Sequence, residues 1–310
     1  MPEDLIKKEQ AYKKITKTLI KVVITILCFW YISHKIDFNL TIESIKKTNW
    51  LYLFYALLLL IFSKLLSAYR LNIYFRNIRL NIPSWHNIKL YWLGMFYNLF
   101  LPGAISGDAY KVIYLNKKLA APYKKTSAAV LLDRFSGILS VGILLAFSGI
   151  IVFPGWWMDM LLATGCILAV VALFLLVKFF MKDFLPGFWP AFTLGMGVQL
   201  SQMICLFLIL RSLGIETNYA TWLFIFLASA VITVLPVSLG GGLGTREFVF
   251  VSGASYFNLD QQTGLLISLL FFLITVLASA GGAYFVFKDP FTSGNVQNIE
   301  KYETKKPGTL

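Results

Sequence analysis

The sequence is poor in charge, in histidine and in cysteine. Charged residues occupy 14% of its 310 positions and hydrophobic residues 58%, whereas soluble domains are about 25% charged. An ordinary soluble domain is therefore excluded, and the composition predicts a membrane protein that crosses the bilayer several times. The two histidines and three cysteines have no spacing typical of a metal or redox site. We expect no metal and no cofactor, although carboxylates alone can hold Mg²⁺.

Catalytic motifs are also missing. The sequence shows no Ser/His/Asp arrangement, no paired acids at catalytic spacing and no His-Glu-x-x-His motif. Its net charge of +13 does not form the folded basic surface or tail that nucleic acids require. We therefore expect a transporter more than an enzyme, with the lipid bilayer and its lipids as partners and no nucleic acid.

Long apolar runs take up most of the chain. A helix needs about 20 apolar residues to cross the hydrocarbon core. Six stretches approach this length: 18–34, 51–69, 127–152, 158–181, 189–210 and 264–287. No cleavage site of small residues follows the first stretch, which predicts a retained span and not a signal peptide.

Two further apolar stretches, 88–120 and 219–258, are interrupted by loops that begin Leu-Pro and continue through Ser and Gly to charged residues. Proline and glycine break helices, so we expect breaks at the positions Pro102, Gly103, Pro236 and Gly240. The arms on either side are short for full crossings. Both stretches are therefore predicted to be re-entrant hairpins, and a pair that enters from opposite faces is typical of an inverted repeat with a binding site near the midplane.

The distribution of lysine and arginine predicts the orientation. With the N-terminus in the cytoplasm and both interrupted stretches as hairpins, cytoplasmic segments carry 20 basic residues and outer segments 4. This asymmetry follows the positive-inside rule, and full crossings would place the basic segment 108–127 outside. We expect an all-α protein of a bacterial inner membrane with both termini cytoplasmic. Its parts would be a basic segment 1–17, one membrane domain 18–288 and a disordered tail 289–310.

Charged residues within apolar runs cost roughly 2.5–3.5 kcal/mol each to insert, so they are candidates for a site. Asp133 and Arg134 begin one span, either as a helix-start pair or with Arg134 facing a cleft, where its guanidinium can bind an anion bidentately. Arg246 and Glu247 follow the second break, and because neighbouring residues on a helix point about 100° apart, they need not pair with each other. Lys64 is expected to extend to the cytoplasmic interface.

The first break ends with Ser106, Gly107 and Asp108, which predict a capped helix whose N-terminus, with Lys111 one turn on, suits a phosphate. A capped helix without a ligand is the alternative. The glycine-rich second break predicts backbone donors for an anion, with a close helix–helix contact as the alternative. The other candidates for substrate binding are Arg70, Asn98, Ser238, Gly241 and Gly244.

At these residues the chain resembles the membrane domain of lysylphosphatidylglycerol synthases and the wider flippase-like family, from about Tyr12 to Asp289. The resemblance is carried by Arg70, by the stretch from Asn98 to Asp108, by Asp133-Arg134-Phe135-Ser136-Gly137, and most specifically by the stretch from Pro236 to Glu247. Ser106 stands where the family commonly has glycine. The aminoacyl-transferase domain of full-length synthases is absent, so the resemblance implies the membrane half alone.

The resemblance and the residues together lead us to expect a translocase that moves an anionic or modified phospholipid, or another lipid-linked anion, between leaflets. The first alternative is a membrane enzyme acting on lipid phosphates, with Asp108 and Glu247 as acid and base. The second is a non-catalytic protein that presents lipid to a separate lipid-modifying enzyme.

Overall fold

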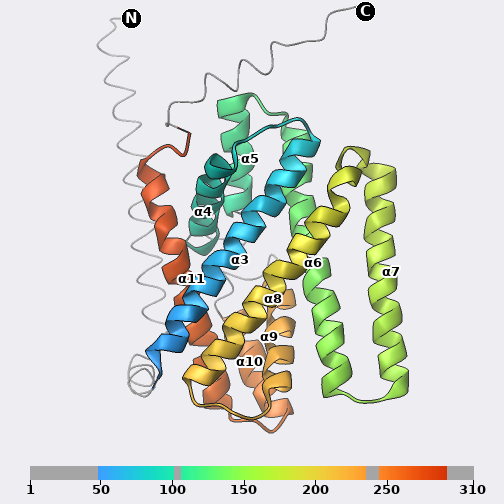
Figure 1. Ribbon diagram of the computed structural model, residues 1–310, viewed down its shortest axis with the longest axis vertical. Helices are drawn as coiled ribbons and strands as arrows, with labels where there is room; N and C mark the ends of the chain where they lie inside the picture. The colour runs from blue at the N-terminus through green and yellow to red at the C-terminus, as the bar shows by residue number, and fades with distance from the viewer. Residues whose placement is uncertain (1–47, 101–105, 235–243, 292–310) are drawn as a thin grey trace, which may run out of the picture.

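The computed structural model describes residues 48–100, 106–234 and 244–291, and within these ranges all regular secondary structure is helical (Figure 1). The elements are α3 (Trp50–Asn77), α4 (Ser84–Phe100), α5 (Ser106–Leu119), α6 (Tyr123–Val152), α7 (Trp156–Phe180), the 3₁₀ helix η1 (Lys182–Gly187), α8 (Phe188–Ser212), α9 (Tyr219–Val234), α10 (Thr245–Tyr256) and α11 (Gln261–Phe287). The predicted all-α polytopic class is confirmed.

Five helical segments are long and apolar enough to cross a membrane. They are α3, α6, α7, the continuous stretch of η1 and α8, and α11. These segments match five of the six predicted spans. The first predicted span, 18–34, and the predicted segment 1–17 lie outside the described residues.

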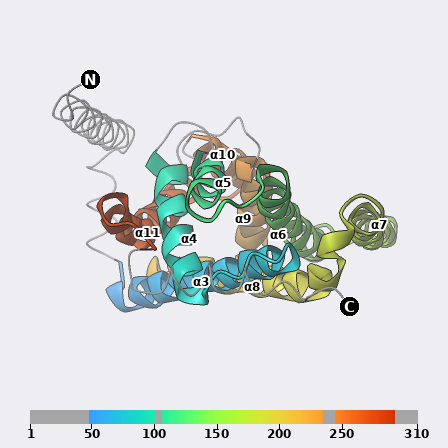
Figure 2. The same cartoon turned by 90° about the horizontal axis from the view of Figure 1, so that it is seen from above.

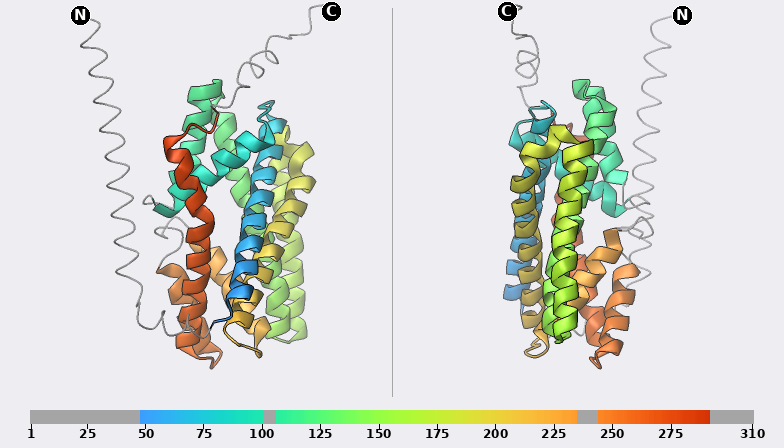
Figure 3. Two further views of the ribbon diagram at one scale, coloured as in Figure 1. Left: turned by 60° about the vertical axis from the view of Figure 1, so that its left-hand side comes forward. Right: turned by 90° about the vertical axis from the view of Figure 1, so that its right-hand side faces the viewer.

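Both interrupted stretches form helical hairpins. In Figure 1 and Figure 3, α4 and α5 enter and leave at the end of the molecule where α3 finishes, whereas α9 and α10 enter and leave at the opposite end. Each arm is shorter than the long helices, from 17 residues in α4 down to 12 in α10. The two predicted opposed hairpins are therefore confirmed. Their turns, with Pro102, Gly103, Pro236 and Gly240, lie outside the described residues.

The helices form two equivalent halves, α3–α6 and α8–α11. The central contact is between α3 and α8, which lie side by side along their length (Figure 2). They run antiparallel, because the Asn49 N–H donates to the Ser212 carbonyl (3.0 Å) at one end and Asn77 Nδ2 donates to the Phe184 carbonyl (3.2 Å) at the other.

Each hairpin packs against a long helix of the other half, and the two halves do this in the same way. In the first half α4 packs against α11, and in the second half α9 packs against α6. Each long helix that follows a hairpin thus supports the hairpin of the other half. This exchange, with the hairpins entering from opposite ends, confirms the predicted inverted repeat.

The two ends of the molecule differ sharply in basic residues. The end where α3, α5 and α11 finish carries Arg76, Arg79, Lys89, Lys117, Lys118, Lys124, Lys125, Lys178, Lys182 and Lys288. Among the described residues, Arg211 is the only basic residue at the opposite end. Exposed tryptophans also mark the ends, with Trp85 and Trp189 toward the basic end and Trp156 and Trp157 at the other. This distribution is typical of a protein that meets two membrane–water interfaces.

Candidate functional site

The first polar group of the interior joins the hairpin α4–α5 to α6. Asp108, in the first turn of α5, accepts a hydrogen bond at Oδ1 from Lys111 Nζ (2.9 Å) and a short one at Oδ2 from Arg134 Nε. The side chains of Asp108 and Lys111 are buried, whereas Arg134 keeps 23% of its side-chain surface exposed. Among these three residues, Arg134 is therefore the cation that a ligand can reach most easily.

The second polar group joins α3 to α6. Arg70 Nε donates to Asp133 Oδ1 at 2.7 Å, and both side chains are buried. Gly137 and Gly195 lie against the guanidinium, since a Cβ atom at either position would be 3.4 Å from it, in van der Waals contact. Arg70 Nη1 and, one turn beyond Gly195 on α8, Gln199 Oε1 are buried without a hydrogen-bond partner among the described residues. A hydrogen-bond donor on Arg70 and an acceptor on Gln199 thus lie beside this ion pair, where a ligand could bind them.

Tyr91 of α4 connects these two groups. The Lys111 ammonium lies 4.3 Å from the centre of the Tyr91 ring, and the Tyr91 hydroxyl also interacts electrostatically with Arg70 and Asp133. Sequence reasoning missed this tyrosine, because a tyrosine in an apolar helix carries no signal that separates it from ordinary packing.

The arms of the first hairpin touch at their backbones. A Cβ atom on Gly107 would lie 1.9 Å from the Gly94 carbonyl oxygen, and one on Gly94 would lie 2.2 Å from Lys111 Cε. The Gly107 N–H donates to Asn98 Oδ1 (2.8 Å), and Ser106 Oγ donates to the Tyr97 carbonyl (2.9 Å). The groups of Asn98, Ser106 and Gly107 that we expected to meet a ligand are therefore used, in this structure, to close the hairpin.

The second hairpin contributes Arg246 and Glu247 at the start of α10. Arg246 is buried, and its guanidinium carbon lies 4.9 Å from the centre of the Phe271 ring on α11. Glu247 turns back, because its Oε2 accepts from the Gly244 N–H (2.6 Å) and its Oε1 from Ser268 Oγ (3.4 Å). Gly244 has a φ of +82°, which favours glycine at this helix start.

The two halves of the site approach each other through Lys64. Lys64 lies in the middle of α3 and is repelled electrostatically by both Arg246 and Arg70. About 20 Å of helix separates it from either end of α3, and its expected extension to the cytoplasmic interface stays a prediction.

The charged residues thus form a line across the interior, from Arg134 through Asp108, Lys111, Arg70 and Asp133 to Lys64 and Arg246. We call this set, with Tyr91 and Glu247, the charged line. It holds five basic side chains and three acidic ones, so its formal charge favours an anion. Ser238 and Gly241, also expected at the site, lie outside the described residues.

The two acidic residues of the enzymatic alternative belong to different parts of this line. Asp108 is held by Lys111 and Arg134 in the first hairpin, whereas Glu247 is held by Gly244 and Ser268 in the second. Each carboxylate has local partners of its own. This arrangement is typical of structural anchoring and charge compensation in a membrane interior.

Comparison with known proteins places the sequence beside membrane proteins. A family model described as the lysylphosphatidylglycerol synthase TM region matches residues 18–187 and 184–282. A UPF0104 membrane protein of Pyrococcus horikoshii is 25% identical over 175 residues, which cover 55% of this chain and 51% of the relative. The chain therefore spans about half the length of the curated relative it matches.

Proposed function

Because the chain belongs to the lysylphosphatidylglycerol synthase TM-region family, we propose that it moves a lipid with an anionic head group between the two leaflets of a membrane. The family takes its name from the membrane region of an enzyme of lipid synthesis, which supports a role with lipids. The lipid class and the movement itself are our proposal.

The observation that supports this proposal best is the charged line. Ionisable residues inside a membrane protein are costly and usually face an interior pathway. Here they join the two opposed hairpins of an inverted repeat, where transporters of this architecture hold their substrates. Because basic residues outnumber acidic ones by two, a phosphate can enter without leaving an excess of negative charge.

Arg134 and Lys111 are the proposed first contacts for the phosphate. In this structure both cations are engaged by Asp108. An arriving phosphate would compete with this carboxylate, since its oxygens accept charge-assisted hydrogen bonds of similar strength. Asp108 would therefore neutralise the two cations when no head group is present. When a lipid binds, its phosphate would replace the Asp108 carboxylate as their partner.

Movement would follow from the inverted repeat. In our proposal the half α3–α6 rocks against the half α8–α11 across the α3–α8 contact and exposes the charged line to each leaflet in turn. The basic end would face the cytoplasm of a plasma membrane, in accordance with the positive-inside rule. The lipid chains would remain among hydrocarbon throughout.

Reconstitution into liposomes tests this function. Purified protein would be incorporated into vesicles that contain trace lipids with fluorescently labelled hydrocarbon chains and different head groups: phosphatidylglycerol, its lysyl derivative, phosphatidylethanolamine and a polyprenyl phosphate. A membrane-impermeant quencher then reports how fast inner-leaflet lipid reaches the outer leaflet. We expect accelerated movement for one anionic or aminoacylated class, and a loss of most of that acceleration in Arg134→Ala.

The matched control is Lys125→Ala, because Lys125 is also basic and paired, with Asp183, but both side chains are more than half exposed. Its vesicles should behave like the unmodified protein. The proposal is wrong if no lipid of the panel moves faster than in empty vesicles, or if Arg134→Ala leaves the rate unchanged.

A further inference from the structure

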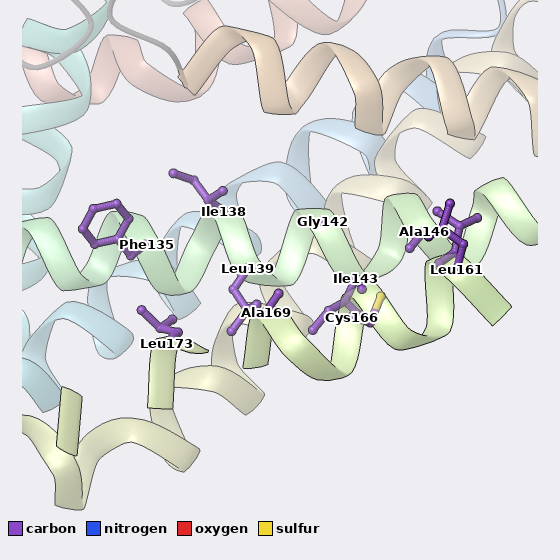
Figure 4. A pocket seen from close by; sticks show the side chains of 12 residues that line it. Phe135, Ile138, Leu139, Gly142, Ile143, Ala146, Leu161, Cys166, Ala169 and Leu173 are labelled. Carbon is purple, nitrogen blue, oxygen red and sulfur yellow. The ribbon is translucent and has the colours of Figure 1, made fainter. Parts of the chain in front are cut away.

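An apolar groove runs between α6 and α7. Its volume is about 410 Å³. Figure 4 shows side chains of α6 and α7 lining it, from Phe135 and Leu173 at one end to Ala146 and Leu161 at the other. The groove opens to the surroundings of the protein, since Phe135 and Leu161 keep 40% and 67% of their surface exposed.

Glycines keep this groove unfilled. Gly142 on α6 and Gly165 on α7 both line it, and a Cβ atom added to either would meet nothing within 4 Å. Among the described helices, α7 packs substantially against α6 and η1 only, and it stands at the edge of the molecule in Figure 2.

The groove has the length of one lipid chain. From Phe135 to Ala146 it follows about 16 Å of α6 at 1.5 Å per residue. Half of a hydrocarbon core about 30 Å thick is about 15 Å. A chain laid in the groove would therefore extend through one leaflet, from mid-depth toward the end of the molecule that carries few basic residues.

The groove begins at the depth of the charged line. Phe135 lines the groove and follows Arg134 on α6, the partly exposed cation that pairs with Asp108. A lipid whose phosphate lies at Arg134 would therefore have its hydrocarbon at the depth at which the groove starts.

We propose that the groove between α6 and α7 binds a hydrocarbon chain of the lipid whose head group occupies the charged line. This inference depends on the proposed function for the identity of the head group, but it makes a separate claim about where the chain lies. The protein would guide both parts of the lipid, which gives it selectivity for chain length as well as for charge.

Photo-crosslinking tests the groove. Phosphatidylglycerol with a diazirine in the middle of one acyl chain would be incorporated with the protein into vesicles, and after illumination the labelled residues would be mapped by mass spectrometry. We expect labelling at Cys166 and Leu139, inside the groove, to exceed labelling at Ile167 on the outer face of α7 several-fold. An excess of unlabelled phosphatidylglycerol should reduce the groove signal selectively.

Two neighbouring substitutions separate the groove from the outer face of the same helix. Gly165→Leu fills the groove, whereas Thr164→Leu adds similar bulk to the opposite side of α7, and neither touches the charged line. Gly165→Leu should lower labelling of the groove several-fold and slow the movement of long-chain lipid more than that of a short-chain analogue. Thr164→Leu should change neither.

The outcomes distinguish this inference from the proposed function. Accelerated lipid movement with equal labelling of groove and outer face would overturn the inference and leave the function standing. Selective labelling that Gly165→Leu removes, without any lipid movement, would support the groove and contradict the function. Oxidative crosslinking of two chains through Cys166 would also overturn the inference, because a second copy would then cover the groove.

Discussion

Arg70 and Asp133 illustrate how single residues hold this protein together. They belong to α3 and α6, and neither charge reaches water easily because their side chains are only 6% and 11% exposed. A buried ion pair adds little to the free energy of unfolding, since the cost of desolvating both charges offsets the attraction between them. Removing one partner is far more costly, because it leaves the other charge buried and uncompensated. The pair is thus a strong constraint on how the two helices pack.

The pair can be tested by single and double substitution. Arg70→Ala should lower the free energy of unfolding by about 3–5 kcal/mol, whereas the double substitution Arg70→Met with Asp133→Leu should restore much of it, since no charge remains buried. Thermal unfolding in detergent measures both. If the double variant regains stability but does not move lipid, the pair serves transport as well as packing.

Lys125→Ala is again the control, because an exposed pair contributes about 1 kcal/mol or less. Equal losses of stability in Lys125→Ala and Arg70→Ala would contradict the argument from burial.

At the scale of elements, the hairpin α4–α5 depends on contacts that only small residues allow. Gly94 and Gly107 bring the backbones of its arms together, and Gly282 does the same between α4 and α11, where a Cβ atom would lie 2.3 Å from the Trp92 carbonyl oxygen. Trp92 Nε1 also donates to the Ala278 carbonyl at 3.0 Å. The hairpin is therefore held at a defined depth against the long helix of the other half.

Gly107→Ala should disrupt this hairpin. The added methyl group would meet backbone, which cannot rotate away as a side chain can, so we expect a loss toward the upper end of about 1–3 kcal/mol in the free energy of unfolding. Gly142→Ala is the matched control, since its methyl group meets nothing within 4 Å and alanine favours helix. Equal thermal stability of the two variants would show that the arms can separate freely.

A second contact ties the end of α11 to the same hairpin. Asp289 accepts short hydrogen bonds from Lys118 and the Tyr114 hydroxyl, and Phe291 beyond it is buried against the rings of His86 and Tyr114. We predicted disorder from residue 289 onward. Residues 289–291 instead pack against the hairpin, and the remainder of that tail lies outside the described residues.

This contact should respond to acid. Partial burial raises the pKa of Asp289, but the hydrogen bonds from Lys118 and Tyr114 outweigh it, and the pKa lies below its usual range. A lowered pKa means that the contact stabilises the folded state above the pKa of an unfolded aspartate, near 3.9, and that this contribution disappears as the pH falls further.

Asp289→Asn measures the effect. The unmodified protein should unfold at a higher temperature than the variant at neutral pH, and the difference should shrink as the pH falls below about 4. A difference that stays the same from neutral pH to pH 3 would contradict the assignment.

At the scale of the whole molecule, the inverted repeat places equivalent elements at opposite ends. One end is rich in basic residues and, among the described residues, the other has Arg211 alone. The repeat allows one chain to present similar hairpins to both leaflets, and the distribution of basic residues predicts a single orientation with the basic end in the cytoplasm.

Thiol labelling in intact cells checks that orientation. Lys117→Cys lies at the basic end and Thr217→Cys at the other, and both positions are exposed. A membrane-impermeant maleimide should reach Thr217→Cys in intact cells and Lys117→Cys only after the membrane is permeabilised. The reverse pattern would invert the topology and, with it, the leaflet from which each hairpin enters.

The sequence by itself determined the membrane class, the positions of the long helices, the two hairpins and the ends with different charge. These properties depend on local composition, because apolar length, proline and glycine breaks and the placement of lysine and arginine can be read along the chain. The candidate cations Arg70, Lys111, Arg134 and Arg246 were found for the same reason, since charge within an apolar run is unusual.

Only the tertiary structure decided which of these residues meet. The pairing of Arg70 with Asp133 and of Arg134 with Asp108, the place of Tyr91 between them and the central position of Lys64 all depend on how helices distant in the sequence pack together. The groove between α6 and α7 also depends on packing, because it is formed by the surfaces of both helices and by neither alone. Side-chain contacts between helices distant in the sequence produce no pattern along a single sequence. The arrangement of the site could therefore be described only from the tertiary structure.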